Sequence, residues 1–280
     1  MTPAAVTHRS WLFVPADSER KIAKALASEA DALIFDLEDS VAPSAKAGAR
    51  AILKALAPRD GGPRWWVRVN PMDSEFHKDD LELLARPDLD GLVLPKSESG
   101  GDIVQLAHRT GSIPVHAIVG ETAAGLFGLL TYRAPGSPLS AMSWGAEDLS
   151  AALGASTKYD ADGTLSFTYC LARALCLAAA VAAGVQPVDT VFADFRDSEG
   201  LRRECEAAAR EGFTGKLAIH PDQVAVINAA FTPTAEDVAH AREIVDAFAA
   251  DPAAGVLAVR GRMVDRPHLI QAEGVLARQR

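Results

Sequence analysis

Short apolar runs alternate with longer alanine-rich segments along most of this 280-residue chain, and this alternation restricts its possible folds more than any other feature. The runs are rich in β-branched and aromatic residues, which is typical of strands buried on both faces. Repeated strand–helix units predict a parallel sheet with right-handed connections. We expect strands at Trp11–Val14, Ala32–Phe35, Trp65–Val69, Gly91–Leu94, Val115–Val119, Ala141–Ser143, Thr190–Ala193 and Lys216–Ile219.

Eight strands in a chain of this length favour an α/β fold of the closed (β/α)8 TIM barrel type over an open doubly wound sheet. The first predicted strand is not followed by G-x-G-x-x-G, and the chain has no G-x-x-x-x-G-K-[ST], which disfavours dinucleotide-binding and P-loop folds. We expect residues 1–234 to form the barrel catalytic domain and residues 235–280 a C-terminal helical extension. Helices are predicted at Ser18–Ser28, Ser44–Leu56, Phe76–Ala85, Gly100–Arg109, Ala123–Leu130, Leu165–Ala183, Ser198–Glu211, Ala235–Ala249 and Leu269–Arg278.

The net charge and the cysteine content indicate which partners and which cellular compartment to expect. A formal net charge of −9 argues against non-specific binding to nucleic acid or to an anionic membrane surface. Cys170, Cys176 and Cys205 match neither a disulfide framework nor a zinc site, which favours a reducing cytoplasm. The first ten residues do not resemble a signal peptide, and the most apolar stretch, Tyr169–Val185, is too short to span a bilayer. We therefore expect a cytoplasmic protein with small-molecule partners.

Polar residues, all but one of them ionisable, follow the predicted strands at the end where α/β barrels carry their chemistry. The general hydrophilicity of loops explains part of this pattern. Nevertheless, the strands themselves are apolar and their ends are crowded with charge. The residues at these positions are Asp36, Glu38, Asp39, Arg68, Asn70, Lys96, Glu121, Glu147, Asp148, Asp194 and His220.

Glu121 and Asp148 are the candidate metal ligands. Carboxylate oxygens suit a hard cation such as Mg²⁺, which takes one or two protein carboxylates and completes its shell with water and substrate oxygens. The chain lacks a His/Cys cluster, which disfavours zinc. The alternative is that both residues only cap the helices that follow them.

Arg68 is the candidate for holding a substrate carboxylate, because its planar fork binds carboxylates in a bidentate manner. It could also pair with Glu38 or Asp39, and the two roles are compatible. Carboxylates crowded at one rim are costly without a cation. Lys96 could form a Schiff base with a carbonyl substrate, but an ion pair with the acidic rim is the favoured interpretation.

Lys21 and Lys24, together with Arg20, lie near the start of the first predicted helix, where backbone donors favour phosphate. A nucleotide-bearing cofactor such as coenzyme A could bind there, although such charges more often form a solvated face. His220 could act as a base, as a cap or as a structural histidine, and the structural role is favoured.

Seven stretches spread over residues 9 to 234 form a recognisable series: RSWLFVPADSERKIAKAL, DALIFDLEDSVAPSAKAGAR, WWVRVNP, GLVLPKSES, ETAAGL, SWGAEDLSAALG and GFTGKLAIHPDQVAVINAAFTPT. In this order they resemble the citrate lyase beta-subunit-like family of the HpcH/HpaI aldolase superfamily. This resemblance implies a TIM barrel, dependence on Mg²⁺, and lyase chemistry on citryl- or malyl-type thioesters, with a coenzyme A thioester as co-substrate.

The resemblance also implies roles for particular residues. Glu121 in E-T-A and Asp148 in G-A-E-D bind the metal, and Arg68 in R-V-N binds the substrate carboxylate beside Glu38 and Asp39. Lys21 and Lys24 match basic positions near coenzyme A phosphates. The segment GRMVDRPHL resembles the G-x-M-[IV]-D segment of malyl-CoA lyases, so Asp265 is the expected catalytic acid/base that reaches a neighbouring subunit of a homo-oligomer, a trimer or hexamer.

The expected function is therefore an Mg²⁺-dependent carbon–carbon lyase that cleaves or forms a malyl- or citryl-type CoA thioester, with an acetyl thioester and a 2-oxo acid as the other reactants. Two alternatives stay open from the residues alone. One is a metal-dependent aldolase acting on free 2-keto acids such as oxaloacetate. The other is a non-catalytic citrate-lyase-like subunit that binds the substrate for its partners.

Overall fold

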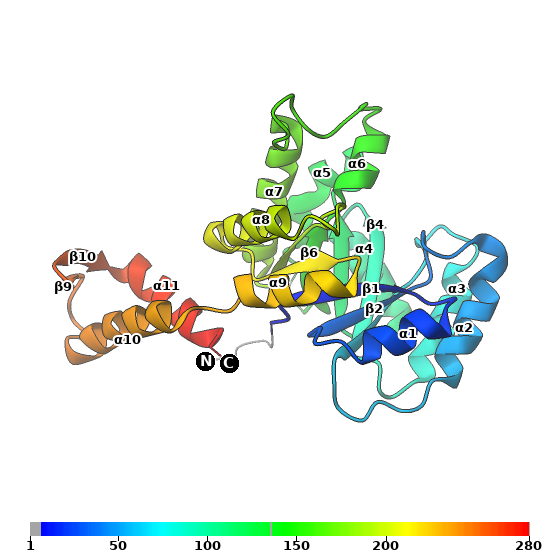
Figure 1. The fold of residues 1–280 in the computed structure, drawn as a ribbon, viewed down its shortest axis with the longest axis horizontal. Coiled ribbons are helices and arrows are strands. Elements are labelled where there is room, and N and C mark those ends of the chain that lie inside the picture. The colour runs from blue at the N-terminus through cyan, green and yellow to red at the C-terminus, as the bar shows by residue number, and fades with distance from the viewer. Residues whose placement is uncertain (1–6, 135, 280) are drawn as a thin grey trace. The chain divides into compact units, whose positions relative to one another are not determined.

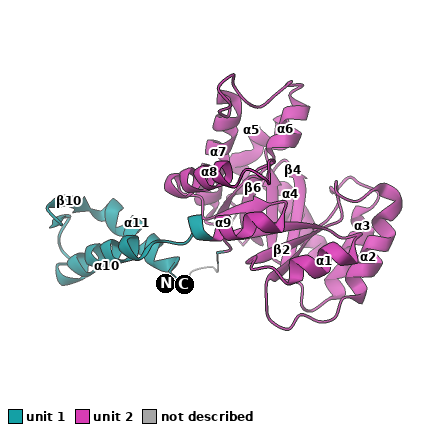
Figure 2. Ribbon diagram, viewed as in Figure 1, with its two compact units in different colours: residues 1–7, 229–280 teal, residues 8–228 magenta. Residues whose placement is uncertain are grey.

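The computed structural model describes residues 7–134 and 136–279, which form two compact units (Figures 1 and 2). The larger unit spans His8–Asn228, and the second comprises Thr7 and the C-terminal residues 229–279. Each unit has a hydrophobic core of its own. No helix in the described ranges combines the length and apolar character needed to cross a bilayer.

Within the described residues, eight parallel strands close into a barrel, which confirms the predicted TIM-barrel fold over an open sheet. Each strand pairs with its neighbours in the sequence, and the pairing of β1 with β8 completes the ring. The strands are β1 (Ser10–Pro15), β2 (Ala32–Asp36), β3 (Arg64–Arg68), β4 (Gly91–Ser97), β5 (Val115–Val119), β6 (Leu139–Trp144), β7 (Gln186–Asp189) and β8 (Gly215–Ala218).

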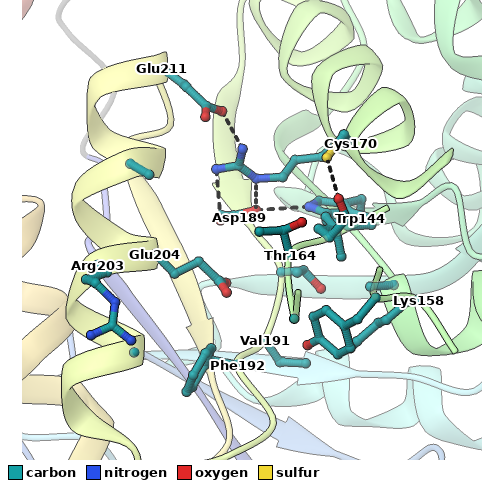
Figure 3. Close-up of a pocket in the computed structure, with 18 of the residues that line it drawn as sticks. Trp144, Lys158, Thr164, Cys170, Asp189, Val191, Phe192, Arg203, Glu204 and Glu211 are labelled. Carbon is teal, nitrogen blue, oxygen red and sulfur yellow. Dashed lines mark hydrogen bonds and ion pairs between the residues drawn. The ribbon is translucent and has the colours of Figure 1, made fainter. Parts of the chain in front are cut away.

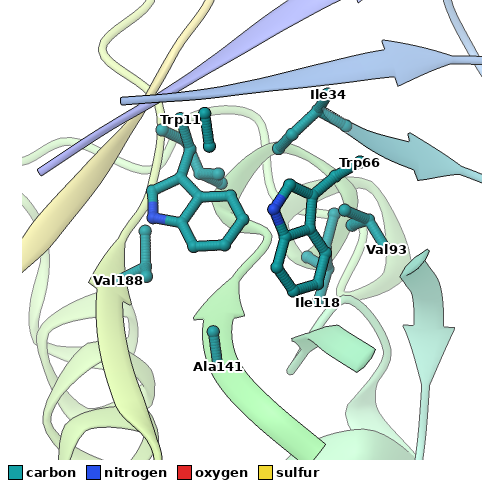
Figure 4. Packing of buried hydrophobic residues seen from close by; sticks show 9 residues of the cluster. Trp11, Ile34, Trp66, Val93, Ile118, Ala141 and Val188 are labelled. Carbon is teal, nitrogen blue, oxygen red and sulfur yellow. The ribbon is translucent and has the colours of Figure 1, made fainter. Parts of the chain in front are cut away.

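Large side chains fill the inside of the barrel (Figure 4). The indole rings of Trp11 and Trp66 meet edge to face with their centroids 5.0 Å apart. The ring of His116 lies 4.6 Å from that of Trp11, and its Nε2 is 2.9 Å from Oγ of Ser143. A packed interior leaves no channel through the barrel, so ligands must bind at its rim.

Helices connect the strands and surround the barrel. The predicted helices occur near their expected positions, and the segment predicted at 76–85 divides into an α-helix and a 3₁₀ turn. The α-helices are α1 (Glu19–Leu26), α2 (Lys46–Ala55), α3 (His77–Asp80), α4 (Gly100–Thr110), α5 (Ala123–Gly128), α6 (Ala146–Ala152), α7 (Phe167–Ala183), α8 (Ser198–Glu211) and α9 (Val224–Ala230). The 3₁₀ turns are η1 (Pro43–Ala45), η2 (Leu81–Ala85), η3 (Leu129–Tyr132) and η4 (Pro221–Gln223).

The seventh strand lies earlier in the chain than the sequence predicts. It covers Gln186–Asp189, whereas the expected range, Thr190–Ala193, follows it. The prediction was wrong because β7 begins with Gln186 and ends with Asp189, so its sequence does not form an apolar run. The Asp189 carboxylate is fully buried and accepts hydrogen bonds from Arg173, Trp144 and Lys216.

The C-terminal unit consists of α10 (Ala235–Ala250), a two-stranded antiparallel sheet of β9 (Val256–Val259) and β10 (Arg262–Asp265), and α11 (Arg266–Ala277). The sequence predicts its two helices but not the hairpin between them. Arg260 and Gly261 connect the strands, and both have positive φ, 50° and 74°, as a tight hairpin turn requires. Arginine at such a position gives no turn signal, and so the hairpin was missed.

Candidate active site

Arg68 lies at the carboxyl end of β3 between two buried carboxylates. Its Nε and Nη2 atoms donate to the two oxygens of Asp36, each at 2.7 Å, and its Nη1 lies 2.7 Å from Oε2 of Glu38. Asp36 and Arg68 end adjacent strands and pair in register, which explains why they meet. Asp36 also accepts hydrogen bonds from two backbone N–H groups of the loop that follows it. The guanidinium is therefore rigidly oriented and retains donors for a further acceptor.

Burial and these ion pairs together set the pKa values of the three groups. Burial alone would raise the pKa of the Asp36 carboxyl, but the charge and hydrogen bonds of Arg68 hold it below its ordinary value. Burial raises the pKa of Glu38 despite its contacts with Arg68 and Lys96. Burial also disfavours the charged guanidinium, yet the adjacent Asp36 keeps the pKa of Arg68 raised. Arg68 thus presents a permanent positive charge at the rim.

Lys96 is joined to the acidic rim through both its side chain and its backbone. Its ammonium group pairs with Glu38 and lies 3.4 Å from Oδ2 of Asp39 and 3.6 Å from Oδ1 of Asp148. Burial tends to lower the pKa of the ammonium group, but Glu38 and the other carboxylates raise it above its ordinary value. A Schiff-base lysine needs a lowered pKa, so these contacts favour the ion-pair role.

The backbone of Lys96 is left-handed, with φ of 51°, at a register shift between β4 and β5. This conformation is uncommon for a residue with a side chain. It directs the Lys96 N–H towards the carboxylate of Glu121, which accepts a hydrogen bond from it. Lys96 therefore contacts Glu38 through its side chain and Glu121 through its backbone.

Glu121 follows β5 and is only 3% exposed. Burial raises the pKa of Glu121 to about 8, although the hydrogen bond from the Lys96 N–H acts to lower it. The nearby charge of Asp148 raises the pKa further. A β-carbon at Gly145 would lie 2.4 Å from Cγ of Glu121, so a glycine there leaves the space that this side chain fills. Thr122, not Glu121, caps α5, which excludes the capping interpretation for Glu121.

Asp148 lies in the first turn of α6, just beyond β6, rather than on the strand. It and Glu121 both face Lys96 and interact with each other electrostatically. A buried carboxylate such as Glu121, with a second carboxylate near it, fits a hard divalent cation well. The described residues contain no group of three or more His, Cys, Asp or Glu in a metal-ligating arrangement. Mg²⁺ needs only one or two protein carboxylates, so the pair suits that ion.

A cavity of about 430 Å³ opens at the ends of β1 and β8. Its lining residues include Arg20, Lys21, Lys24, His220 and Phe13. The three basic side chains have no ion pair with any other part of the chain that the structure describes. Phe13 also packs under Arg68, with its ring centroid 4.7 Å from the guanidinium carbon, so the basic cavity adjoins the carboxylate cluster.

A larger cavity of about 750 Å³ lies between the ends of β6 and β7 and helices α7 and α8 (Figure 3). Asp189 at its base accepts from Nε1 of Trp144 at 3.0 Å and from Nε of Arg173 at 3.1 Å. Arg173 also pairs with Glu211. These charges satisfy one another, which marks the base of this cavity as a structural ion network.

Asp265 is the last residue of β10 and the N-cap of α11 in the C-terminal unit. Its Oδ1 lies 2.5 Å from Nδ1 of His268, and this contact lowers the pKa of Asp265. Within its own unit, Asp265 therefore has a local capping role.

The predicted ion pairs of Arg68 with Glu38 and of Lys96 with the acidic rim are both present. Asp36 was among the predicted strand-end residues, but its role in orienting Arg68 from the adjacent strand was not singled out. No local signal marks the left-handed Lys96 backbone or the space that Gly145 leaves for Glu121. Both depend on how distant segments meet.

Comparisons with known proteins identify close relatives over the whole length. The family model for HpcH/HpaI aldolase/citrate lyase matches residues 9–221. A (3S)-malyl-CoA thioesterase of Cereibacter sphaeroides is 38% identical over 99% of this chain and 96% of its own length. A citrate lyase subunit beta-like protein of Mycobacterium tuberculosis is 40% identical over 96% of this chain and 94% of its own length. An L-malyl-CoA/beta-methylmalyl-CoA lyase of C. sphaeroides is 37% identical, with coverage of 99% and 96%.

Solved structures agree with these relatives. Protein CitE from M. tuberculosis, in complex with magnesium, acetoacetate and coenzyme A, superposes with a TM-score of 0.82 at 39% identity and covers 96% of this chain and 97% of its own. A citrate lyase beta subunit from M. tuberculosis, complexed with oxaloacetate and magnesium, superposes with a TM-score of 0.73 at 39% identity. It covers 80% of this chain and 96% of its own.

Proposed function

The chain belongs to the HpcH/HpaI aldolase/citrate lyase family, and from this membership we propose that it is an Mg²⁺-dependent lyase acting on malyl- or citryl-type coenzyme A thioesters. The observation that carries the proposal is that Glu121 and Asp148 both approach Lys96, the first at its backbone N–H and the second at its ammonium group, with the oriented Arg68 at the same rim. The named activities of similar proteins, a malyl-CoA lyase among them, support this substrate class.

Glu121 and Asp148 are the proposed metal ligands. A bound Mg²⁺ would act as a Lewis acid that stabilises negative charge developing on substrate oxygen. Lys96 contributes a fixed positive charge at the same place and orients Glu121 through its backbone N–H. Complexes of similar proteins with magnesium support the choice of ion.

Arg68 is proposed to hold the substrate carboxylate with the N–H groups that Asp36 and Glu38 leave free. The two acids fix the guanidinium before the substrate arrives, so little conformational entropy is lost on binding. Glu38 pairs with Arg68, and Asp39 lies beside the Lys96 ammonium group. We therefore assign Glu38 and Asp39 to the wall of the substrate pocket.

The basic cavity of Lys21 and Lys24 is proposed to bind the phosphates of coenzyme A. Its neighbour Phe13 connects it to Arg68, so a thioester held at the phosphates could reach the carboxylate cluster. A complex of a similar protein with coenzyme A supports this assignment.

In cleavage, the substrate hydroxyl gives its proton to solvent and the adjacent carbon–carbon bond breaks. The electron pair of that bond passes to the acetyl thioester as an enolate, and the hydroxyl carbon becomes the keto carbon of a 2-oxo acid. Asp265 of a second subunit is the proposed acid that protonates the enolate carbon, which requires a homo-oligomer, a trimer or hexamer. Asp265→Asn should abolish turnover while Mg²⁺ binding persists, and full activity in that variant would remove Asp265 from the reaction.

A second candidate is hydrolysis of the same thioesters, because a relative of similar length and 38% identity is named a thioesterase. The two reactions differ in their products. A lyase releases an acetyl thioester and a 2-oxo acid, with no free thiol. A thioesterase releases free coenzyme A and the hydroxy acid.

One assay decides between these functions. Purified protein is incubated with Mg²⁺ and malyl-, methylmalyl-, citramalyl- or citryl-CoA, and 2-oxo acid and free thiol are measured in parallel. Chelation of the metal and the variants Glu121→Gln and Asp148→Asn should each abolish 2-oxo acid formation. Activity that survives chelation and both substitutions would disprove the proposed metal site. Thiol release without 2-oxo acid would establish hydrolysis instead.

A further inference from the structure

The loop after β2, residues 37–41, presents acidic side chains to the candidate site, and its backbone is held from two directions. The N–H groups of Glu38 and Ser40 donate to the carboxylate of Asp36, at 2.9 and 3.1 Å. The carbonyl groups of Leu37 and Glu38 accept from Nζ of Lys46, at 2.7 and 2.9 Å. One ammonium group therefore joins consecutive peptide units of this segment, which we call the β2 loop, and fixes the course of the chain at Glu38.

Lys46 occupies a position where local forces disfavour a cation. It is the first residue of α2, so its charge lies at the positive end of the helix dipole. The residue is only 6% exposed, and burial lowers the pKa of its ammonium group, although the charges of Asp80 and Asp36 act to raise it. Within the described ranges, Lys46 forms no ion pair with a carboxylate. Its contacts with the β2 loop therefore account for a lysine at this position.

A second side chain holds the β2 loop from the neighbouring strand. Nδ2 of Asn70 donates to the carbonyl of Leu37 at 3.0 Å and to Oδ2 of Asp80 at 2.7 Å. Asp80 is fully buried, and its other oxygen accepts from Nη1 of Arg50 at 3.0 Å. Asn70 lies two residues after Arg68, which ends β3. This support therefore joins the β2 loop to the strand that carries the guanidinium.

The position of the β2 loop matters because Glu38 contacts both cations of the site. Its carboxylate pairs with Arg68 and with Lys96, and Glu38 is only 3% exposed. Breaking a buried ion pair leaves charges that burial destabilises, so this carboxylate tolerates little displacement. A shift of the peptide that carries Glu38 would therefore disturb the groups proposed to hold the substrate carboxylate.

We propose that Lys46 is a positioning residue, which holds the β2 loop so that Glu38 meets the two cations of the site before the substrate arrives. Lys46 acts through Glu38, because its ammonium group contacts the backbone of the loop. This inference rests on the proposed function, since it assigns Lys46 a part in orienting the same site. Loss of the ammonium group should release the loop and lower activity but leave the metal in place, because the proposed metal ligands belong to other segments.

The first test does not depend on turnover. Lys46→Met keeps nearly the length of the side chain but removes the ammonium group. Hydrogen exchange followed by mass spectrometry should show faster exchange at the amides of residues 38–41 in this variant and no change in β5 or α6. Lys54→Met is the matched control, because it makes the same change on a side chain of α2 that is 46% exposed. It should leave exchange in the loop unchanged. Unchanged exchange in Lys46→Met would overturn the proposal.

The second test measures activity and metal binding on the same variants. Lys46→Met should lower kcat/KM for 2-oxo acid formation about 100-fold, because displacing active-site groups by about 1 Å typically costs this much. Titration calorimetry should find its Mg²⁺ binding unchanged, and Lys54→Met should match the wild type in both. In a Glu38→Gln background, Lys46→Met should have little further effect, because residues that act through one contact are not additive. Full activity of Lys46→Met, or losses that add in the double variant, would refute the proposal.

The outcomes separate this inference from the proposed function. A wild type that forms no 2-oxo acid would contradict the lyase reaction, whereas hydrogen exchange would still report whether Lys46 holds the β2 loop. If the wild type releases free thiol instead, the same variants are compared by that product. Lys46→Gln retains a donor for one carbonyl and should show an intermediate loss, and it replaces Lys46→Met if that variant does not fold. If neither variant folds, Lys46 has only a structural role and the proposal is wrong.

Discussion

Replacing Gly145 with alanine tests directly whether neighbouring backbone holds Glu121 in place. The added β-carbon would lie 2.4 Å from Cγ and 3.0 Å from Oε1 of Glu121. The φ of Gly145 is −105°, which alanine adopts without strain, so the close contact is the only new effect. Because Cγ is not the flexible end of the side chain, Glu121 must change rotamer and lose its hydrogen bond from Lys96.

Overpacking of this kind costs about 1–3 kcal/mol of stability. At roughly 2–4 °C per kcal/mol for a domain of this size, the melting temperature should fall by several degrees. Loss of support for a metal ligand typically weakens metal binding roughly 10- to 100-fold. Isothermal titration with Mg²⁺ and a thermal melt measure the two effects on the same sample.

The matched control is Gly48→Ala, because a β-carbon at this exposed position of α2 would meet nothing within 4 Å. Relative to glycine, alanine there should stabilise the helix by about 0.5–1 kcal/mol and leave Mg²⁺ binding unchanged. If Gly145→Ala binds Mg²⁺ as tightly as the wild type and melts at the same temperature, then Gly145 does not set the position of Glu121. The proposed geometry of the metal site would then be wrong.

Three further predictions follow from the same contacts. Arg68→Lys keeps the charge but loses the planar fork, so kcat/KM should fall about 100-fold, mainly through KM; an unchanged KM would exclude Arg68 from carboxylate binding. Burial lowers the pKa of His116 to about 3, whereas the pKa of a histidine in the unfolded chain is near 6.5. The contribution of His116 to folding stability is therefore complete above the unfolded-state pKa, and it is lost as the pH falls because only the unfolded chain then takes up a proton. Between about pH 7.5 and about pH 5 this loss is about 2 kcal/mol, and denaturant titrations should find it missing in His116→Gln. The double variant Lys21→Ala/Lys24→Ala should raise KM for a CoA ester roughly tenfold but not KM for the matching N-acetylcysteamine thioester, and equal effects on both would exclude phosphate recognition.

The fold was predictable because strands buried on both faces leave apolar runs that any parallel barrel shares. The exception, β7, shows the limit of that signal. Its last residue, Asp189, is buried because it accepts hydrogen bonds from Arg173 of α7, Trp144 of β6 and Lys216 of β8. The sequence around Asp189 gives no indication of these three partners. The hairpin of β9 and β10 was missed because Arg260 adopts a turn conformation that its residue type does not favour.

The residues of the candidate site and some of its ion pairs were predictable, but its full arrangement was not. Position at strand ends was enough to select Arg68, Glu121 and Asp148. Their supports come from elsewhere in the chain: Asp36 from the adjacent strand, and Gly145 from the loop before α6. Contacts of this kind depend on register and on backbone angles, which a single sequence does not encode locally.

Lys96 illustrates how narrow the choice of amino acid becomes when peptide and side chain serve different neighbours. Its N–H reaches Glu121 only with a left-handed backbone, and its ammonium group reaches Glu38 only through a long cationic side chain. Glycine would satisfy the first condition at no steric cost but would lose the second. Asparagine tolerates the backbone but has no charge, and arginine replaces a compact charge with a broad planar one. None of these substitutions preserves both contacts of Lys96. Position 96 should therefore tolerate fewer substitutions than the exposed residues around it.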